Sequence, residues 1–387
     1  MKLAQVFDPR NNALNAWRLI LATGVILGHS WPLTGHNLPH VIDQLLDQFW
    51  VDGFFVISGY LITSSWIRNP RVREYLAARG LRILPGLWVC LLIIAFVIAP
   101  VGVAIQGGSA ANLLMSAAPF EYVLNNAVLN FYYAGIAGTP RGIPWPGMWN
   151  GSLWTLIFEM LCYMAVVLAG LAGLLKRRWP IVVLFALAVA VSALISYPVL
   201  GTETTLQIIA RFTVVFAAGA VLHQYQDLVP ARWSLVALCG AIVIAAGLFV
   251  PNYRIVAAIP LAYAVVVSGA LIKTARLRFR NDLSYGIYIY AWPMQQLLII
   301  CGLGFLHPTV LTIVAAIVTL PLAALSWFLV EKRAISLKSR LKPRPKPKIP
   351  AETLSVADRD PGTSAADHFA EQPPPPRAEQ SLPRHRR

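Results

Sequence analysis

Leu14 to Leu33 (LNAWRLILATGVILGHSWPL) is an apolar stretch of twenty residues that carries two ionisable side chains, Arg18 and His29. As a helix it is long enough to cross the hydrocarbon core of a bilayer, which is about 30 Å thick. The two side chains are eleven residues apart, so they share one helical face at a separation of about 16 Å along the axis. Ionisable groups at membrane depth cost about 2.5 kcal/mol or more, and they persist where they face a cavity and act. The stretch predicts a functional membrane helix rather than a simple anchor.

The composition of the whole chain supports a membrane protein. The 387 residues are 57% hydrophobic and 13% charged, with a mean hydropathy of +0.62, whereas soluble domains carry about 25% charged residues. The polar start (MKLAQVFDPRNN) and the absence of a small-residue cleavage site indicate that the first span is retained. We therefore expect an all-α polytopic membrane protein.

Ten apolar segments are long enough to cross the bilayer. They lie at 14–34, 48–67, 83–105, 152–175, 180–198, 206–222, 233–250, 255–272, 283–303 and 308–330. The semi-polar region 109–136 is predicted to be a re-entrant or interfacial helix, with an eleventh span as the alternative.

The positive charges agree with ten crossings and with both termini in the cytoplasm. With that orientation, the cytoplasmic segments receive nearly all basic residues outside the spans, and the opposite side receives only Arg141 and Arg254. The net charge of +15 is therefore explained by short loops and the tail, and no nucleic-acid partner is expected. The four cysteines occur singly in apolar spans and suggest no metal site.

The chain divides into three predicted parts. Residues 1–13 form a cytoplasmic N-terminus and residues 14–335 the transmembrane domain. Residues 336–387, which include KPRPKPKIP and PPPP, form a basic, proline-rich tail. Such a composition cannot bury enough apolar surface to fold, so we expect disorder in the cytoplasm, with the basic start near anionic lipid.

His29 is the strongest candidate for proton chemistry, because it alone among the seven histidines lies within a predicted span. A neutral imidazole suits general-base catalysis near neutral pH. The alternative is a structural histidine satisfied by polar neighbours near the outer interface. Arg18 on the same face favours the catalytic interpretation.

Two further segments carry candidate site residues, one predicted near mid-membrane and one on the cytoplasmic side. Ser58 and Gly59 form a small pair in the second span, which permits close approach of a ligand or simply of another helix. Arg79 and Arg82 are three residues apart where the third helix is expected to begin. The plain explanation of this arginine-rich loop is topological, as positive charge on the cytoplasmic side. The two guanidinium groups also match phosphate oxygens in bidentate geometry, which makes a phosphorylated cytoplasmic donor an attractive partner.

Glu159 is the acidic residue predicted to lie inside a span away from its ends. Ser152 is seven residues earlier, about two turns, and faces the same way. The carboxylate could pair with Arg18, orient His29 or pair with Arg211, or it could form a purely structural ion pair.

Several motifs occur together in the order found in a known family. They are Arg18-x10-His29, FFVISGYLI (54–62), Arg79-x-x-Arg82 followed by Ile83, Leu84 and Pro85, GSLWTLIFEMLCY (151–163), LSYGIYIYAWP (283–293) and SWFLVEKRA (326–334). The chain resembles the membrane-bound acyltransferase-3 family of bacterial O-acyltransferases over residues 10–335.

The resemblance implies transfer of an acyl group, most often acetyl, from cytoplasmic acyl-CoA to a sugar hydroxyl of a surface glycan or its lipid-linked precursor. The implied location is the bacterial inner membrane, with glycan-assembly proteins as partners. By matching position, His29 is the base and Arg18 its companion, Arg79 and Arg82 contact the CoA phosphates, and Glu159 is a buried structural or catalytic carboxylate. Ser58, Gly59, Ser152 and Tyr288 are expected near the site, in substrate contact or packing. No metal and no permanently bound cofactor are expected.

The chain departs from the family pattern at two informative places. Ala16-Trp17 replaces an Asp-Gly that often precedes the first-helix arginine, and Ala291-Trp292-Pro293 lacks a histidine that many relatives carry nearby. His29 would therefore carry the proton chemistry alone. No Cys or Ser is placed beside it as a nucleophile, so direct transfer is favoured over an acyl-enzyme, with acylation of His29 itself as the remaining variant. The main alternative is a proton-coupled secondary transporter, but no inverted repeat of the motifs is visible.

Overall fold

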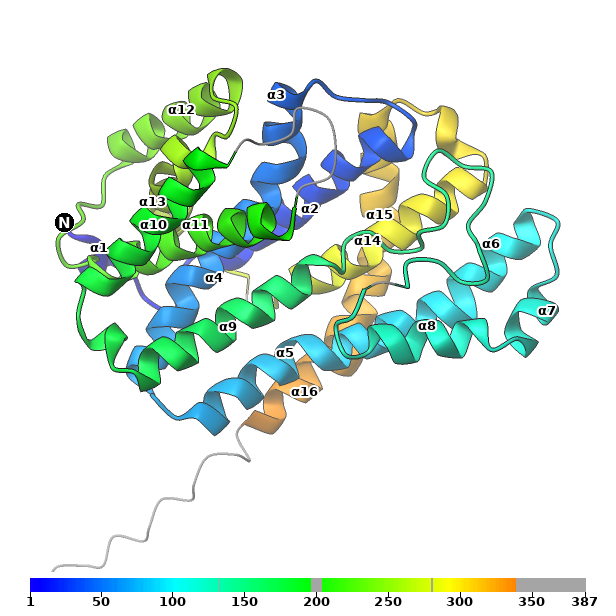
Figure 1. Cartoon of the computed structure of the whole chain (residues 1–387), viewed down its shortest axis with the longest axis horizontal. Coiled ribbons are helices and arrows are strands. Elements are labelled where there is room, and N and C mark those ends of the chain that lie inside the picture. The colour runs from blue at the N-terminus through cyan, green and yellow to red at the C-terminus, as the bar shows by residue number, and fades with distance from the viewer. Residues whose placement is uncertain (132, 196–203, 280, 339–387) are drawn as a thin grey trace, which may run out of the picture. The chain divides into compact units, whose positions relative to one another are not determined.

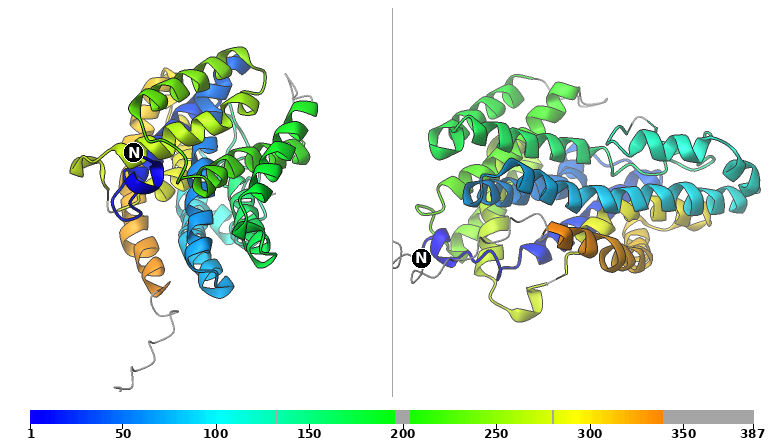
Figure 2. Two further views of the ribbon diagram at one scale, coloured as in Figure 1. Left: turned by 90° about the vertical axis from the view of Figure 1, so that its left-hand side faces the viewer. Right: turned by 90° about the horizontal axis from the view of Figure 1, so that it is seen from below.

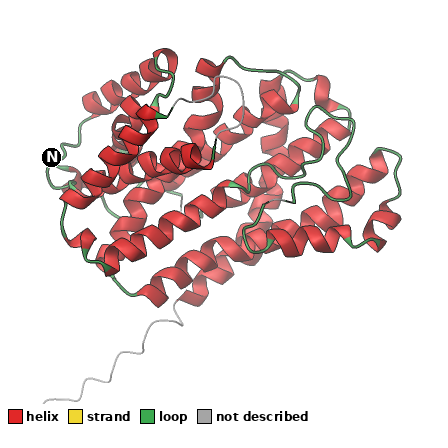
Figure 3. Ribbon diagram, viewed as in Figure 1, coloured by secondary structure: helices red, strands yellow, loops and turns green. Residues whose placement is uncertain are grey.

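The computed structural model describes residues 1–131, 133–195, 204–279 and 281–338. Helices and loops make up this part of the chain, and no strand occurs in it (Figure 3). In chain order the helices are α1 (Leu3–Val6), α2 (Leu14–Leu33), α3 (His40–Asp43), η1 (Gln44–Gln48), α4 (Phe49–Arg68), α5 (Val72–Ile93), η2 (Ile94–Ile98), α6 (Ala99–Ile105), α7 (Ala110–Met115), α8 (Ala118–Asn126), α9 (Thr155–Leu171), η3 (Leu174–Lys176), α10 (Trp179–Leu194), α11 (Thr205–Gln224), α12 (Trp233–Phe249), α13 (Arg254–Leu271), η4 (Ala275–Leu277), α14 (Ser284–Ile300), η5 (Leu303–Phe305), α15 (Pro308–Ser326), η6 (Trp327–Glu331) and α16 (Lys332–Ser336).

The helices confirm the predicted fold class in its coarser form, an all-helical multi-pass membrane protein. Within the described ranges, five helices are both long and apolar enough to cross a membrane: Val41–Arg68, Val72–Ile105, Thr205–Gln224, Arg254–Leu271 and Pro308–Ser336. Three shorter apolar helices are α9, α10 and α12. Each of the ten predicted segments contains a helix, while the number of crossings and the side of each terminus stay predictions.

One helix begins well before its predicted start. The third span was expected from residue 83, but α5 begins at Val72 and continues through η2 and α6 to Ile105 (Figure 2). The segment VREYLAARGLR is polar, so an apolar window does not detect it, yet it is rich in the good helix formers Arg, Leu, Ala and Glu. Arg79 and Arg82 therefore project from a helix, which fixes their spacing.

The region 109–136 contains the short helices α7 and α8. The nine residues of α8 extend about 14 Å, roughly half of a bilayer core, so this helix cannot cross alone. It folds back and packs beside α5 and η2 (Figure 1). This placement fits the predicted re-entrant or interfacial helix better than an eleventh span.

The core forms where helices distant in the sequence cross. Helix α4 packs along α11, and α14 packs against both α2 and α15 (Figure 1). At the α4–α11 crossing Phe55 stacks on Phe212 with ring centroids 4.1 Å apart. Gly59 packs against the Phe216 carbonyl, and Gly219 against the Val56 carbonyl. The two glycines let the backbones of α4 and α11 touch.

A cluster of buried charged side chains surrounds Asp52. Asp52 of α4 is fully buried and accepts hydrogen bonds from Arg211 (3.3 Å), Arg254 (2.5 Å) and Tyr253 (2.6 Å). This cluster ties α4, α11 and α13 together, and its carboxylate has the partners that a buried charge requires.

Residues 339–387 of the predicted tail lie outside the described residues, and the division of the chain at residues 13 and 335 stays a prediction.

Candidate active site

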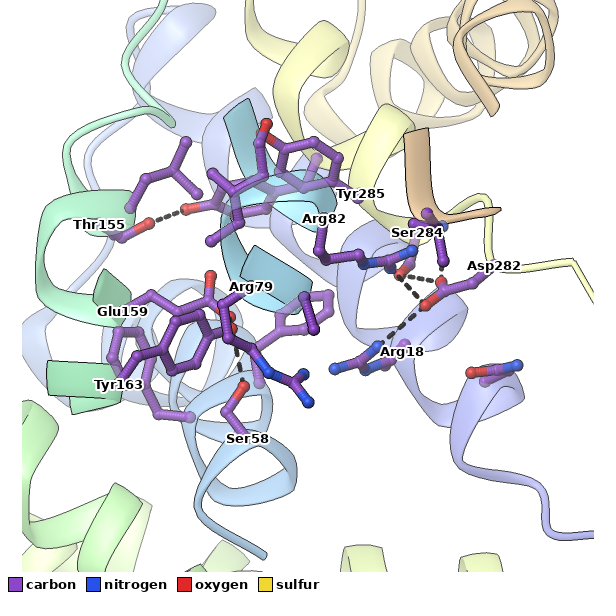
Figure 4. A pocket seen from close by; sticks show the side chains of 18 of the residues that line it. Arg18, Ser58, Arg79, Arg82, Thr155, Glu159, Tyr163, Asp282, Ser284 and Tyr285 are labelled. Carbon is purple, nitrogen blue, oxygen red and sulfur yellow. Dashed lines mark hydrogen bonds and ion pairs between the residues drawn. The ribbon is translucent and has the colours of Figure 1, made fainter. Parts of the chain in front are cut away.

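A cavity of about 350 Å³ lies between α2, α4, α5, α9 and α14, with the end of the last helix at its edge. Figure 4 shows the side chains that point into it. Six predicted site residues from five helices line it: Arg18, Ser58, Arg79, Arg82, Glu159 and Tyr288. Residues separated by as much as 270 positions thus share one cavity, which the sequence motifs alone could not show.

Asp282 holds two of the cavity arginines in place (Figure 4). Its Oδ2 accepts from Arg18 at 2.9 Å and from Arg82 at 2.5 Å, and its Oδ1 accepts from the Ser284 hydroxyl at 2.5 Å. Burial alone would raise the pKa of this carboxyl, but the charges of Arg82 and Arg18 and the Ser284 hydrogen bond outweigh it, so the pKa lies below its usual range. Asp282 is therefore an anionic anchor just before α14.

Sequence reasoning missed Asp282, because it directly precedes the predicted span 283–303. A signal was present: Asn281-Asp282 stands immediately before an apolar helix, where Asn and Asp favour helix starts. That signal indicates a helix boundary and does not reveal that the carboxylate pairs with Arg18, which is 264 residues away.

Arg79 remains less engaged by the protein than Arg82. It donates to the Ser65 hydroxyl at 3.2 Å, and its guanidinium lies 5.6 Å from the Tyr75 ring centroid and 5.9 Å from that of Tyr163. The Nε atoms of Arg18 and Arg79 are buried without a hydrogen-bond partner, and both guanidinium groups point into the same open space in Figure 4. Such groups are suited to a bidentate anionic ligand.

The described cavity lining carries more positive than negative charge. Arg18, Arg79, Arg82 and Lys338 stand against Glu159 and Asp282. The low-dielectric walls strengthen the field of this excess, which favours an anionic ligand in the cavity.

Glu159 faces the cavity from α9. Its Oε1 accepts from the Ser58 hydroxyl at 3.4 Å and from the Tyr163 hydroxyl. These contacts differ from the three partners considered from the sequence, since Arg18 pairs with Asp282 and Arg211 contacts Asp52. Tyr163 could not be selected beforehand, although its position four residues after Glu159 places it on the same helical face.

Tyr288 of α14 lines the cavity. Its hydroxyl lies 2.5 Å from the Thr155 hydroxyl and donates to the Ser152 carbonyl at 2.8 Å. Phe54 packs edge-on against its ring, with centroids 5.9 Å apart. Ser152 thus contributes its backbone, and its own hydroxyl is buried without a partner. Gly59, by contrast, serves helix packing and does not line the cavity.

His29 is not part of the cavity lining. Its ring packs edge-on against Trp292 with centroids 4.7 Å apart, and its Nδ1 is buried without a hydrogen-bond partner. Trp292 follows Tyr288 by one helical turn, about 6 Å along α14. The structure therefore gathers the arginines and Glu159 in one cavity and leaves His29 outside it, against Trp292.

Comparisons with known proteins identify the family of the chain. An Acyltransferase domain model, that of the acyltransferase-3 family, matches residues 11–328. A protein named O-acetyl transferase from Shigella phage Sf6 is 27% identical over 363 residues, which cover 85% of this chain and 98% of the relative. Nodulation protein 10 of Rhizobium leguminosarum bv. viciae is 30% identical over 368 residues, covering 87% of this chain and 96% of the relative. No solved structure matches the chain significantly.

The family model covers all five helices around the cavity and every predicted site residue from Arg18 to Tyr288. Both relatives align over nearly their whole length. The chain belongs to the acyltransferase-3 family and is a multi-pass membrane acyltransferase.

Proposed function

We propose that the protein is an O-acetyltransferase that moves an acetyl group from cytoplasmic acetyl-CoA to a sugar hydroxyl on the far side of the bacterial inner membrane. The observation that carries this proposal is the cavity in which Arg18, Arg79 and Arg82 meet Glu159 and Tyr288. One relative's name, O-acetyl transferase, supports acetyl as the group transferred.

The contacts between loops support ten crossings with both termini inside. At one end of the helices, Leu3 bonds Val229 (2.8 Å), Lys273 bonds the Val6 carbonyl (3.0 Å), and Arg178 pairs with Asp227 (3.0 Å). All these residues belong to segments predicted to be cytoplasmic. They are rich in Lys and Arg, as the positive-inside rule requires.

The charge of the cavity supports acyl-CoA as the donor. CoA is polyanionic, and Arg18, Arg79 and Arg82 place three positive charges in the cavity lining, with Arg18 and Arg82 held there by Asp282. The pantetheine arm is long and mostly apolar, which suits the apolar lining residues Phe54, Phe55 and Leu156. The thioester would then lie near Tyr288, one layer from His29.

The proposed reaction is a direct transfer. The His29 imidazole accepts the proton of a sugar hydroxyl while the sugar oxygen bonds to the thioester carbonyl carbon. The carbon–sulfur bond breaks, and the CoA sulfur leaves with the proton that His29 has accepted. Glu159 stays hydrogen bonded to Ser58 and Tyr163 and shapes the cavity wall beside the thioester.

The acceptor class follows from the direction of transfer. A hydroxyl that reaches His29 from the side opposite the donor cavity belongs to a surface glycan or its lipid-linked precursor, supplied by glycan-assembly proteins. The bilayer holds a lipid-linked acceptor at the right depth.

The test is acyl transfer from radiolabelled acetyl-CoA to the glycan fraction of membranes, comparing the intact protein with His29→Ala. We expect the label to appear with the intact protein and to fall by about 10²-fold or more in the variant, the usual contribution of a general base. His307→Ala, which changes an exposed loop histidine, is the matched control and should transfer normally. Equal labelling by His29→Ala at equal abundance would remove His29 from the chemistry.

A further inference from the structure

Two layers of side chains separate the cavity from His29. The first layer is Tyr288, fixed by Thr155, the Ser152 carbonyl and Phe54. The second is Trp292, whose ring contacts His29 on one side and lies 6.0 Å from the Trp145 ring on another. Trp292 is 5% exposed and lines no part of the cavity.

Gly151, in the segment before α9, packs directly against the Trp292 ring. A Cβ atom at Gly151 would lie 2.7 Å from two atoms of that ring, closer than real side chains allow. Gly151 is therefore required for the ring to occupy this position. The next residues, Ser152 and Thr155, hold Tyr288, so one short segment supports both layers.

Trp292 is held by packing and not by polar contacts. Its Nε1 hydrogen is buried without a hydrogen-bond partner, which makes this orientation costly. Pro293 follows it and has no N–H, so the Ile289 carbonyl lacks its helical donor. Asn150 fills that gap at 2.7 Å. The backbone around the ring is thus pinned by Asn150, whereas the indole N–H would gain a polar partner if the ring turned.

We propose that the Trp292 side chain is a movable partition between the donor cavity and His29. The inference rests on the proposed function. In the orientation seen here the ring keeps the thioester from His29 and from water on the acceptor side. When an acceptor is in place the ring turns away, and the thioester, the hydroxyl and His29 meet.

The partition has a chemical purpose. Without it, water could take the place of the sugar hydroxyl: the water oxygen bonds to the thioester carbonyl carbon, the carbon–sulfur bond breaks, and free CoA thiol and acetate form. Closed sites exclude water for this reason. A defective partition should therefore appear as acyl-CoA hydrolysis in the absence of any acceptor.

The experiment measures acetyl-CoA hydrolysis by the full chain in membranes without acceptor, and acetyl transfer with acceptor. Trp292→Ala should raise hydrolysis severalfold over the intact protein, and Trp292→Phe should stay close to the intact protein. Gly151→Ala displaces the ring from the other side and should also raise hydrolysis, which keeps the proposal testable if Trp292→Ala does not fold. The control is Trp233→Ala, because Trp233 is 54% exposed and lines no part of the cavity.

A second measurement tests directly whether a reagent can reach the cavity from the acceptor side. Val51→Cys, in a chain whose Cys90, Cys162, Cys239 and Cys301 are replaced by alanine, places a thiol in the cavity lining and leaves the contacts that hold Tyr288 intact. A membrane-impermeant thiol reagent added from the acceptor side should label it in the Trp292→Ala background and leave it unlabelled when Trp292 is present.

The outcomes separate the two proposals. Folded Trp292→Ala and Gly151→Ala proteins that hydrolyse acetyl-CoA as slowly as the intact protein, while that protein transfers acetyl normally, would overturn the partition. An intact protein that neither binds nor consumes acetyl-CoA would overturn the proposed function instead.

Discussion

At the scale of single residues, Asp282 is the most informative side chain, because it pairs with both Arg18 and Arg82. Asp282→Asn keeps the shape and removes the charge, so two largely buried arginines lose their counterion. Breaking a buried pair costs about 3–5 kcal/mol. Because the arginines are partly exposed, we expect the free energy of unfolding to fall by about 3 kcal/mol. Thermal unfolding in detergent measures it.

Asp227→Asn is the matched control. Asp227 also pairs with an arginine, Arg178 at 3.0 Å, but both side chains are about half exposed. Exposed pairs contribute little, so its melting temperature should not change. Equal losses in the two variants would contradict the assignment of Asp282 as a buried anchor.

The lowered pKa of Asp282 also predicts a pH dependence. A carboxyl whose pKa is depressed on folding contributes stability fully above its unfolded pKa of about 3.9, and the contribution is lost as the pH falls toward the folded value. The stability difference between the intact protein and Asp282→Asn should therefore be constant from about pH 5 to 8 and shrink in acid. Unfolding at stepped pH checks this, and a difference that shrinks near neutral pH would contradict it.

Residue types explain what the sequence could and could not reveal about the site. Arg18, Arg79, Arg82 and Glu159 stood out because ionisable groups at or near membrane depth are rare, and all four line the cavity. Thr155 and Tyr163 did not stand out, since hydroxyl residues are ordinary in such helices. The separation of His29 from the cavity depends on the Trp292 ring, which no spacing rule can orient.

At the scale of helices, the α4–α11 crossing depends on Gly59 and Gly219. A methyl group at either position would overlap a backbone carbonyl of the other helix. Gly59→Ala and Gly219→Ala should each cost about 1–3 kcal/mol, as overpacking in a close-packed core does. The melting temperature in detergent and the yield of folded protein measure the effect.

Gly240→Ala is the control for these two variants. Gly240 lies in α12, and a Cβ there meets nothing within 4 Å. Alanine favours helix by about 1 kcal/mol over glycine, so this variant should be unchanged or more stable. A loss at Gly240 as large as at Gly59 would mean that the crossing does not depend on close approach.

Helix positions were largely predictable, whereas one boundary was not. Each of the ten segments predicted from apolar length contains a helix, and eight of these helices are apolar in the described residues. The start of α5 at Val72 was not predicted, because its first turns are polar and owe their helicity to local propensity. The contact of Gly59 with Phe216 required knowing which helices are neighbours, which apolar length does not encode.

At the scale of the whole transmembrane domain, orientation in the membrane decides whether the cavity can take a cytoplasmic donor. The loops that meet around Leu3, Val229 and Lys273 are basic. Loops at the opposite end meet through other contacts: Gln106 bonds the Arg141 carbonyl at 2.5 Å, and Trp31 packs on His307. Loops predicted on the same side of the membrane thus contact one another, as they should if the predicted alternation of sides is right.

Cysteine labelling tests that orientation. In a chain whose four native cysteines are replaced by alanine, Arg73→Cys and Arg276→Cys place exposed thiols in the predicted cytoplasmic segments, and Asn37→Cys places one on the other side. An impermeant maleimide should label Asn37→Cys in intact cells and the other two only after permeabilisation. Because Arg79 and Arg82 lie on the helix that follows Arg73, labelling of Arg73→Cys in intact cells would turn the cationic cavity away from the cytoplasm. The donor could then not be cytoplasmic acyl-CoA, whatever the chemistry at His29.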